Sequence, residues 1–346
     1  MFEFPAKFHL LSGLLGLLLL FSHAGIAASH NNPDDPGFDD QPLKDDVVLP
    51  DWFKMSFLEL KDDLSDARES GKKGLIIYFG QKRCPYCKAL IENNWGQQDI
   101  INYTRKNFDV IAIDVRGQKP VIDLNGKSWT ERSYSVAQKT NFTPSLIFYD
   151  LQGREALRLR GYRPPYQFRA ALEYAADAHY LEEPFNLYLA RAEKAFRYGK
   201  DGLNENDFFL PPPYMLDRTH FVADRPLLIA YERPRCHACD ILHGGPLNDP
   251  RIRKLLSKFD VVQLDMSADI PLVTPAGKKT TTRQWAQTMN LDYAPTLIFF
   301  DERGREIIRI DSVVWFYRLQ NVLTYVDSKA YRKQPNFQIW RQQQQR

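Results

Sequence analysis

The four cysteines of this chain are its clearest candidates for chemistry, and they occur as two pairs with the spacing Cys-x-x-Cys. The pairs are Cys84 with Cys87 and Cys236 with Cys239. Two thiols three positions apart at the start of a helix suit disulfide exchange, in which one thiolate attacks and the other resolves the mixed disulfide. The spacing therefore predicts two catalytic thiol-disulfide sites, with Cys84 and Cys236 as the nucleophiles.

Two other uses of the cysteines remain open. A structural crosslink normally joins distant positions, because its entropic effect grows with the loop it closes, and a Cys-x-x-Cys loop is nearly the smallest possible. A zinc site of four thiolates would require the two pairs, about 150 positions apart, to meet. Neither pair has further cysteine or histidine neighbours at ligand spacing, so we expect no metal site and no bound cofactor.

An internal repeat positions both cysteine pairs. Residues 74–163 and 226–310 each begin with a continuous apolar run that is typical of a strand buried on both faces. The cysteine pair, a helix, a second strand, another helix and a strand led by Pro144 or Pro295 follow in the same order. The second cysteine and this proline are 57 positions apart in one copy and 56 in the other. Strands alternating with helices in this way predict the α/β class, with an antiparallel hairpin after the proline.

Helix boundaries can be predicted from capping residues and apolar spacing. Asp99 and Asp249 stand where a helix should start in each copy, as N-terminal caps. Ahead of the first copy, a helix is expected from about Phe53, with Phe57 and Leu64 on its apolar face.

Composition limits the class of protein and of partner. With 346 residues, 44% of them hydrophobic, the chain can bury the cores of two ordinary domains. The 46 basic and 43 acidic residues nearly cancel, so neither nucleic acid nor an anionic membrane surface is expected as a partner.

The N-terminus resembles an export signal. Lys7 and His9 precede an apolar run over 10–21, and small residues follow it. The run is shorter than the roughly 20 residues that a membrane-spanning helix needs, so cleavage is favoured over an uncleaved anchor. We expect a mature protein in the periplasm without stable membrane insertion.

The whole chain is thus expected to contain six segments. They are a signal peptide (1–28), a flexible acidic leader (29–50), a first domain with the motif Cys-Pro-Tyr-Cys (51–181), a helical and proline-rich linker (182–220), a second domain with the motif Cys-His-Ala-Cys (221–335) and a polar tail expected to fray (336–346).

The order of strand, cysteine pair, helix, strand, helix, proline-led hairpin and helix resembles the thioredoxin superfamily in both halves. Within it, the halves are similar to exported members of the SoxW type and to the C-terminal domain of the electron transporter DsbD. The resemblance implies two tandem thioredoxin-like domains, each a central mixed β-sheet flanked by helices. It also implies that Pro144 and Pro295 are cis, and that they and the preceding residues, Thr143 and Ala294, bind a substrate strand.

Two departures from thioredoxin itself concern the surroundings of the cysteines. Thioredoxin has a buried aspartate six positions before its first cysteine, where this chain has Tyr78 and Ala230. It has a tryptophan immediately before that cysteine, where this chain has Arg83 and Arg235. The usual proton acceptor for the second thiol is therefore missing from its expected position.

Charged neighbours are expected to tune the thiol pKa values. Arg83 and Arg235 can lower a thiol pKa electrostatically, and His237 can stabilise the Cys236 thiolate when it is protonated. The alternative interpretation of these residues is a solvated basic loop. Because the residues between the cysteines differ, Pro85-Tyr86 in one site and His237-Ala238 in the other, the sequence predicts unequal reduction potentials.

The leading functional hypothesis is an enzyme, a periplasmic thiol-disulfide oxidoreductase that exchanges disulfides with protein thiols as a reductase or electron-transfer thioredoxin. A membrane electron donor of the DsbD or CcdA type is the partner that the resemblance implies. A disulfide isomerase is one alternative. Another is that one repeat, more readily the second, is a redox-silent peptide-binding module.

The first testable prediction concerns export. The mature protein should begin between Ala27 and Asn31 and fractionate with soluble periplasmic contents, because the apolar run is too short to anchor it. Mass spectrometry of the purified N-terminus and cell fractionation check this. Recovery of the intact N-terminus in the membrane fraction would contradict it.

Overall fold

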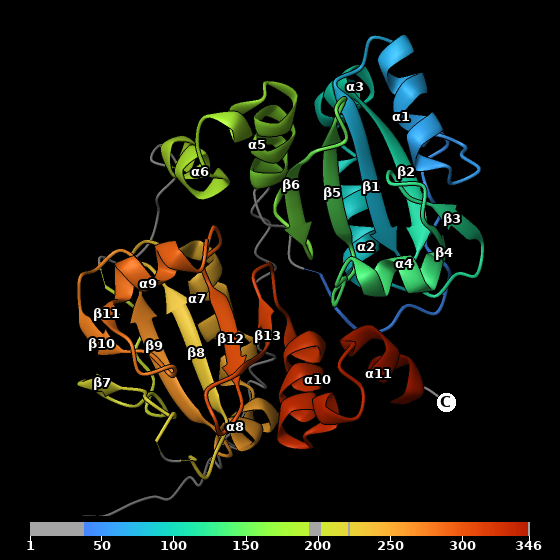
Figure 1. Ribbon diagram of the computed structural model, residues 1–346. Helices are drawn as coiled ribbons and strands as arrows, with labels where there is room; N and C mark the ends of the chain where they lie inside the picture. Colours follow the sequence, from blue (N-terminus) through green and yellow to red (C-terminus); the bar gives the residue numbers. More distant parts are fainter. Residues whose placement is uncertain (1–37, 194–201, 221, 345–346) are drawn as a thin grey trace, which may run out of the picture.

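The computed structural model describes residues 38–193, 202–220 and 222–344, and within them it has two domains of similar build (Figure 1). The predicted signal peptide (1–28) lies outside the described residues. Among the helices of the described segments, none has the length and apolar character needed to cross a membrane.

The first domain is built on a four-stranded sheet with the order β2-β1-β5-β6. Its strands are β1 (Gly74–Gly80), β2 (Phe108–Asp114), β5 (Ser145–Asp150) and β6 (Glu155–Arg160). β1 pairs in parallel with β2 and antiparallel with β5, so that Ile77 lies between Ile111 and Ile147. Every residue of β1 is buried, which confirms the prediction from its apolar run.

Helices cover both faces of this sheet because β1 sends alternate side chains to opposite sides. Ile76 and Tyr78 point into one core, whereas Leu75, Ile77 and Phe79 point into the other. The first core is closed by α2 (Pro85–Ala89), α3 (Gln98–Asn107) and α5 (Pro165–Ala176). The second is closed by α1 (Leu60–Glu69), α4 (Glu131–Ala137) and the small hairpin of β3 (Pro120–Ile122) and β4 (Ser128–Thr130).

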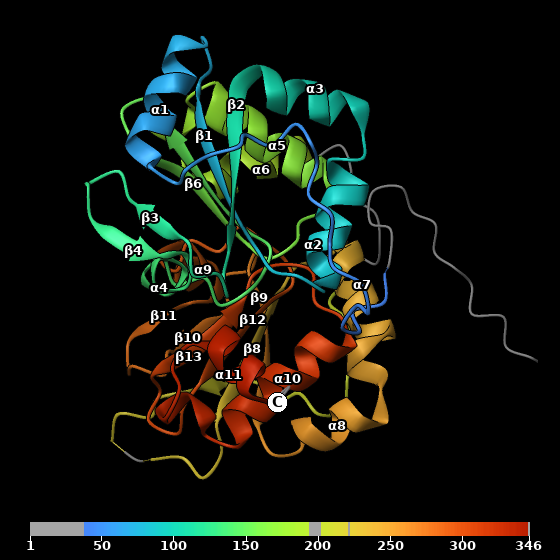
Figure 2. The same cartoon turned by 90° about the vertical axis from the view of Figure 1, so that its right-hand side faces the viewer.

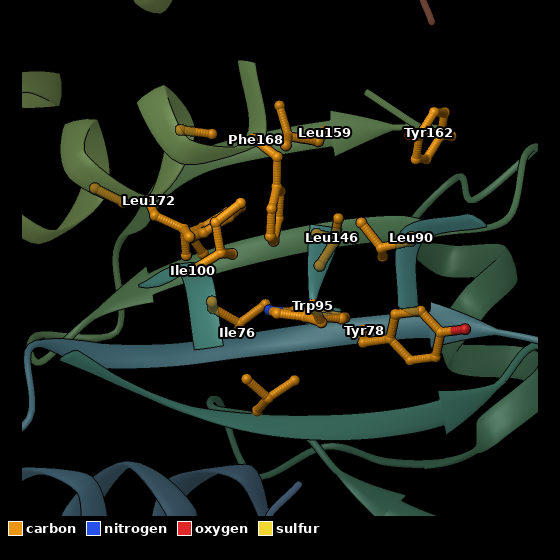
Figure 3. Packing of buried hydrophobic residues seen from close by; sticks show 14 of the residues in the cluster. Ile76, Tyr78, Leu90, Trp95, Ile100, Leu146, Leu159, Tyr162, Phe168 and Leu172 are labelled. Atoms are coloured by element: carbon orange, nitrogen blue, oxygen red, sulfur yellow. The ribbon is translucent and has the colours of Figure 1, made fainter. Parts of the chain in front are cut away.

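Trp95 lies at the centre of the first core (Figure 3). Its ring meets those of Phe53, Tyr78 and Phe168 edge-on, with centroids 5.1, 6.1 and 5.3 Å apart. The indole N–H donates to Thr104 Oγ1 at 3.3 Å, so the polar edge of the ring is satisfied inside the core. Large rings packed in this way supply much of the apolar area that a domain buries.

The second domain repeats the sheet, in the order β9-β8-β12-β13. The strands are β8 (Leu227–Glu232), β9 (Asp260–Asp265), β12 (Thr296–Phe300) and β13 (Glu306–Ile310). The helices are α7 (His237–Gly244), α8 (Pro250–Leu256) and α10 (Phe316–Asp327) on one face and α9 (Thr282–Thr288) on the other. β10 (Pro271–Val273) and β11 (Lys279–Thr281) form a hairpin that is equivalent to β3 and β4, and β7 (Tyr214–Met215) pairs in parallel with β10. The predicted α/β class and the repeated mixed sheet are confirmed.

The two described ends of the predicted linker pack on different domains. α6 (Phe185–Glu193) lies against α5, where the rings of Phe185 and Tyr174 are 5.1 Å apart. The other described end of the linker, from residue 202 onward, packs on the second domain. Asn204 donates a hydrogen bond to Asp240 of α7 at 2.9 Å, and β7 pairs with β10. The domain boundaries near residues 181 and 221 stay a prediction.

Each domain inserts one aromatic side chain into the core of the other. Phe142 and Tyr293 occupy equivalent positions in the repeat, two residues before the proline of each copy. Phe142 is buried in the second-domain core, 5.4 Å from the ring of Phe337. Tyr293 is buried in the first-domain core, with the guanidinium of Arg163 4.7 Å from its ring centroid. Both proline loops are therefore anchored at the domain interface.

The flexibility predicted for the leader is wrong for its described part. Residues 38–50 form no helix or strand, but they run beside α2 toward α10 (Figure 2). Asp40 is 5% exposed and accepts hydrogen bonds from the Tyr86 hydroxyl at 2.8 Å and from the backbone N–H groups of Tyr317 and Arg318 at 3.0 and 2.8 Å. Acidic composition predicts solvation on average, whereas this one carboxylate satisfies open donors at the start of α10.

The prediction of a frayed tail is also wrong over most of 336–346. α11 (Phe337–Gln344) packs against both domains, with Phe337 and Trp340 buried. These two rings are three positions apart, so they lie on one face of the helix. The prediction missed this apolar face because the composition of the tail is mostly polar.

The N-terminal helix begins later than predicted. α1 starts at Leu60, and Leu58 has a left-handed backbone (φ 65) that separates the preceding chain from the helix. Phe57 is consequently 96% exposed, whereas Leu64 is buried as expected.

One of the two predicted aspartate caps is present. Asp249 accepts the Arg251 N–H at 2.8 Å and caps α8. Asp99 is already inside α3 and instead pairs with Arg169 at 2.8 Å. The prediction for Asp99 was therefore wrong by two positions, because Gln97 occupies the cap.

Truncating the central indole should destabilise the first domain. We expect Trp95→Ala to lower the free energy of unfolding by about 3–5 kcal/mol, because it leaves a cavity among three rings. The matched control is Phe57→Ala, which removes an exposed ring and should change the free energy of unfolding by about 0.5 kcal/mol or less. Urea unfolding followed by circular dichroism measures both. Equal effects of the two substitutions would contradict the assigned core.

Candidate active sites

The first cysteine pair forms a disulfide at the start of α2. Cys84 is the N-cap residue, and its Sγ accepts the Cys87 N–H at 3.0 Å. Both residues are buried, Cys84 to 2% and Cys87 to 0% exposure. After reduction, the same N–H group and the positive end of the helix would stabilise a thiolate on Cys84.

The second pair has the same local geometry at the start of α7. Cys236 and Cys239 are disulfide-bonded, and Cys236 Sγ accepts the Cys239 N–H at 3.1 Å. Since each pair is bonded within itself, the joint four-thiolate zinc site is not formed in this state. Across the described segments, no three side chains of His, Cys, Asp or Glu are grouped as metal ligands.

The structure brings the predicted proline loops to the cysteines. Both peptide bonds are cis, the one between Thr143 and Pro144 and the one between Ala294 and Pro295. Thr143 Oγ1 lies 3.4 Å from Cys84 Sγ, and the carbonyl oxygen of Ala294 lies 3.5 Å from Cys236 Sγ. A role of these four residues in substrate binding stays a prediction.

The second domain covers the first site. Arg318 of α10 donates through Nη2 to the carbonyl oxygen of Thr143 at 2.9 Å, and its guanidinium lies 3.3 Å from the ring centroid of Tyr86. The Tyr86 hydroxyl also accepts the Trp315 N–H at 2.9 Å. Burial raises the pKa of Tyr86 well above its ordinary value. The backbone acceptor expected to bind a substrate strand at this site is therefore already used.

The second site presents its motif to solvent. His237, the residue after the first cysteine, is exposed, as is Arg235 before it. In the first site the equivalents of His237 and Arg235 are Pro85, which is half-buried, and Arg83, which is exposed. Tyr86 is buried, and its equivalent Ala238 is half-buried against the first-domain core. The two copies thus share a backbone arrangement but differ in what can reach the residues between the cysteines.

Charge around the first cysteine is balanced by the leader. Asp46 lies 3.5 Å from both Lys82 Nζ and Arg83 Nε, in an exposed cluster. Arg83 and its counterpart Arg235 also share a left-handed backbone, with φ of 51 and 54. The sequence identified the basic residues but not the carboxylate that offsets them, because Asp46 was assigned to a flexible segment.

A buried titratable pair next to the second site was missed. Glu232 ends β8, is fully buried, and has Oε1 2.8 Å from Nε2 of His243. His243 follows Cys239 by four positions on α7, so both lie on one face of that helix. The equivalent positions of the first copy hold Gly80 and Ile91. The second site therefore has a candidate proton acceptor that the first site does not have at these positions.

Comparison with known proteins agrees with the geometry. A family model described as a thioredoxin-like domain matches residues 60–176 and 222–327. No curated protein matches this chain.

Solved structures of similar fold include a thioredoxin-fold protein from Helicobacter pylori, with 21% identity and a TM-score of 0.34, covering 42% of this chain and 89% of that one. An oxidoreductase, DsbH, shares 13% identity at a TM-score of 0.27, over 41% of this chain and 94% of that one. A mutant thioredoxin from Halobacterium salinarum shares 15% identity at a TM-score of 0.24, over 36% of this chain and 96% of that one.

The two nucleophiles should differ in acidity. We expect the Cys236 thiol to have the lower pKa, because His237 can add a hydrogen bond or charge while Asp46 offsets the basic residues beside Cys84. Alkylation rates against pH, measured on reduced variants that keep one cysteine pair, give both values.

Two single substitutions are the controls for this prediction. His237→Ala should raise the pKa of Cys236, and Asp46→Asn should lower that of Cys84 by leaving Lys82 and Arg83 unbalanced. A Cys84 pKa at or below that of Cys236 in the otherwise unchanged protein would contradict the assignment.

Proposed function

The chain belongs to the thioredoxin-like domain family, and from this premise we propose that it is an exported protein that passes electrons between dithiols in the periplasm. Thiol-disulfide oxidoreductase activity follows from the fold and its two Cys-x-x-Cys pairs. The observation that carries the proposal is the placement of Cys84 and Cys236 as helix N-caps, each with a resolving cysteine one turn away.

The exchange proceeds in two balanced steps at either pair. The thiolate of the first cysteine attacks a substrate disulfide, forming a mixed disulfide and releasing one substrate thiolate. The second cysteine, as thiolate, then attacks the mixed disulfide, so that the protein pair is oxidised and the substrate leaves as a dithiol. At the second site, we propose the buried Glu232 as the group that takes the proton of Cys239, because its partner His243 lies one helical turn after that cysteine on α7.

We assign exchange with proteins to the second site. His237 is exposed beside Cys236, whereas its equivalent Pro85 is half-buried, and Tyr86 beside it is buried beneath Trp315 and Arg318. A protein substrate needs an exposed motif, and the second site offers one. This favours an active second repeat over the redox-silent peptide-binding alternative.

The supply of electrons follows from the resemblance to exported thioredoxin-like proteins. A membrane donor of the DsbD or CcdA type would reduce one pair, and the chain would act as a reductase toward periplasmic disulfides. The reduction potential of each pair, determined by equilibration with dithiothreitol or glutathione, tests this direction. A strongly oxidising value at both pairs would assign the chain to oxidation or isomerisation instead.

Removal of the resolving thiol should trap the partner. We expect Cys239→Ala to accumulate mixed disulfides between Cys236 and periplasmic proteins, because the second step of exchange is blocked. Non-reducing electrophoresis followed by mass spectrometry identifies the linked cysteines.

The matched variant is Cys87→Ala, which should give fewer protein adducts because the second domain covers the first site. The double variant Cys236→Ser, Cys239→Ala is the negative control. If neither single variant yields a cysteine-dependent adduct, exchange with protein dithiols is not the function of this chain.

A further inference from the structure

A pocket opens beside the first disulfide. Its volume is about 850 Å³, and its wall includes Cys84 and Thr143. The second domain contributes Arg318 to the wall, α11 contributes Arg341, and the leader contributes Asp40. Clefts of about 300–1,000 Å³ are the usual size for small-molecule binding. The exchange-active sulfur thus lies at a pocket formed by both domains together with the leader and the tail.

The wall of this pocket is positively charged. Five basic and three acidic side chains line it. Three of the basic residues come from separate elements: Arg116 follows β2, Arg318 lies in α10 and Arg341 in α11. Burial, together with repulsion from Arg318 and Arg116, lowers the pKa of Arg341 to about 10. Burial also lowers the pKa of Arg318 and of Arg116.

The acidic residues of the pocket already have hydrogen-bond or ionic partners. Asp40 accepts from the start of α10 and from Tyr86, as described above. Asp46 pairs with the two exposed basic residues before Cys84. Asp114 accepts the backbone N–H of Arg116 at 2.9 Å. Arg341 lies close enough to Arg318 and Arg116 to be repelled by their charges. A carboxylate that entered the pocket would offset this repulsion, and guanidinium groups bind carboxylates with paired hydrogen bonds.

An extended protein segment is disfavoured at this site. Its backbone would pair beside the carbonyl oxygen of Thr143, where the Arg318 side chain already lies and donates a hydrogen bond at 2.9 Å. A small ligand that enters the pocket needs no such pairing.

Resting on the proposed exchange chemistry, we propose that the pocket binds a low-molecular-weight disulfide or thiol bearing carboxylates, with the arginines holding its carboxylates and Cys84 exchanging with its sulfur. The Cys84 thiolate attacks one sulfur of the bound disulfide and forms a mixed disulfide, and one ligand thiolate leaves. The Cys87 thiolate then displaces the second, so the ligand is reduced to two thiols and the protein pair is oxidised. The reverse sequence oxidises two ligand thiols.

Disulfides of matched length and different charge test the proposal. The probes are 3,3′-dithiodipropionate with two carboxylates, neutral 2-hydroxyethyl disulfide and cationic cystamine. Each is mixed with the reduced full chain in which Cys236 and Cys239 are replaced by serine, and oxidation of the first pair is followed by stopped flow. The converse variant, with Cys84 and Cys87 replaced, gives the reference rates that correct for the intrinsic reactivity of each probe.

After this correction, the dianionic probe should react about tenfold faster than the neutral one at low ionic strength, and salt should reduce the preference. Arg341→Gln should lower the rate with the dianionic probe about fivefold and leave the neutral probe unchanged, and Arg341→Lys should retain most of the rate. Arg303→Gln, on the exposed turn between β12 and β13, is the matched control and should change neither rate.

The outcomes separate this proposal from the proposed function. If the neutral probe reacts but carboxylates bring no advantage, the pocket proposal is wrong and thiol exchange stands. A preference that persists in Arg341→Gln and in Arg116→Gln would overturn it as well, because the arginines would not be its cause. If the first pair reacts with no probe while the second does, Cys84 is not an exchange nucleophile and both assignments for this site fail.

Discussion

The Asp40 carboxylate is the constraint on which the arrangement of the first site depends. A buried carboxylate is tolerated only when hydrogen bonds replace its hydration, and Asp40 obtains them from the Tyr86 hydroxyl and from two N–H groups at the start of α10. The leader thereby caps a helix from 278 positions away. It also fixes α10 against Tyr86, so that Arg318 reaches the carbonyl oxygen of Thr143. The burial of the first site by the second domain, and the walls of the pocket beside it, both depend on the position of the Asp40 carboxylate.

Repetition explains what the two domains share, and the interface explains how they differ. Both have the same strand order, a register shift in the strand after the proline, and a helix that starts at the first cysteine. Phe142 and Tyr293 are exchanged between the cores in the same way. The two copies differ in the chain that packs outside the repeat and in individual residues within it. The leader and α11 lie at the first site, whereas Glu232 and His243 form a buried pair next to the second.

The predictable part of this fold and site is the part encoded by local pattern. Continuous apolar runs identified β1 and β8, and the equal spacing from cysteine to proline located both sites, because these signals need no knowledge of distant contacts. The predictions from sequence were wrong where a single residue behaves differently from what the average composition of its segment predicts. Asp40 was hidden in an acidic leader and Trp340 in a polar tail, and both are buried only because a remote element offers them a partner. The partner of His243 is not visible in the sequence for the same reason, since Glu232 reaches it only after the sheet and helix pack. Phe57 fitted a helical pattern that the backbone at Leu58 interrupts.

The motif of the first site is connected to the other domain by hydrogen bonds, whereas the motif of the second site meets the other domain through the apolar packing of Ala238. Tyr86 lies between the two cysteines of the first disulfide, and its hydroxyl joins Asp40 to the Trp315 N–H. A shift of α2 on reduction would therefore reach α10 through groups that are buried and hydrogen-bonded, where low polarity makes such contacts strong. At the second site the position equivalent to Tyr86 holds Ala238, whose methyl group makes no such hydrogen bonds, and His237 before it is exposed. One chain thus combines a thiol pair that is coupled to the packing of its domains with a thiol pair whose motif faces solvent. The asymmetry arises from the leader and the tail, and also from residues that differ within the repeat, such as Tyr86 against Ala238 and Gly80 against Glu232.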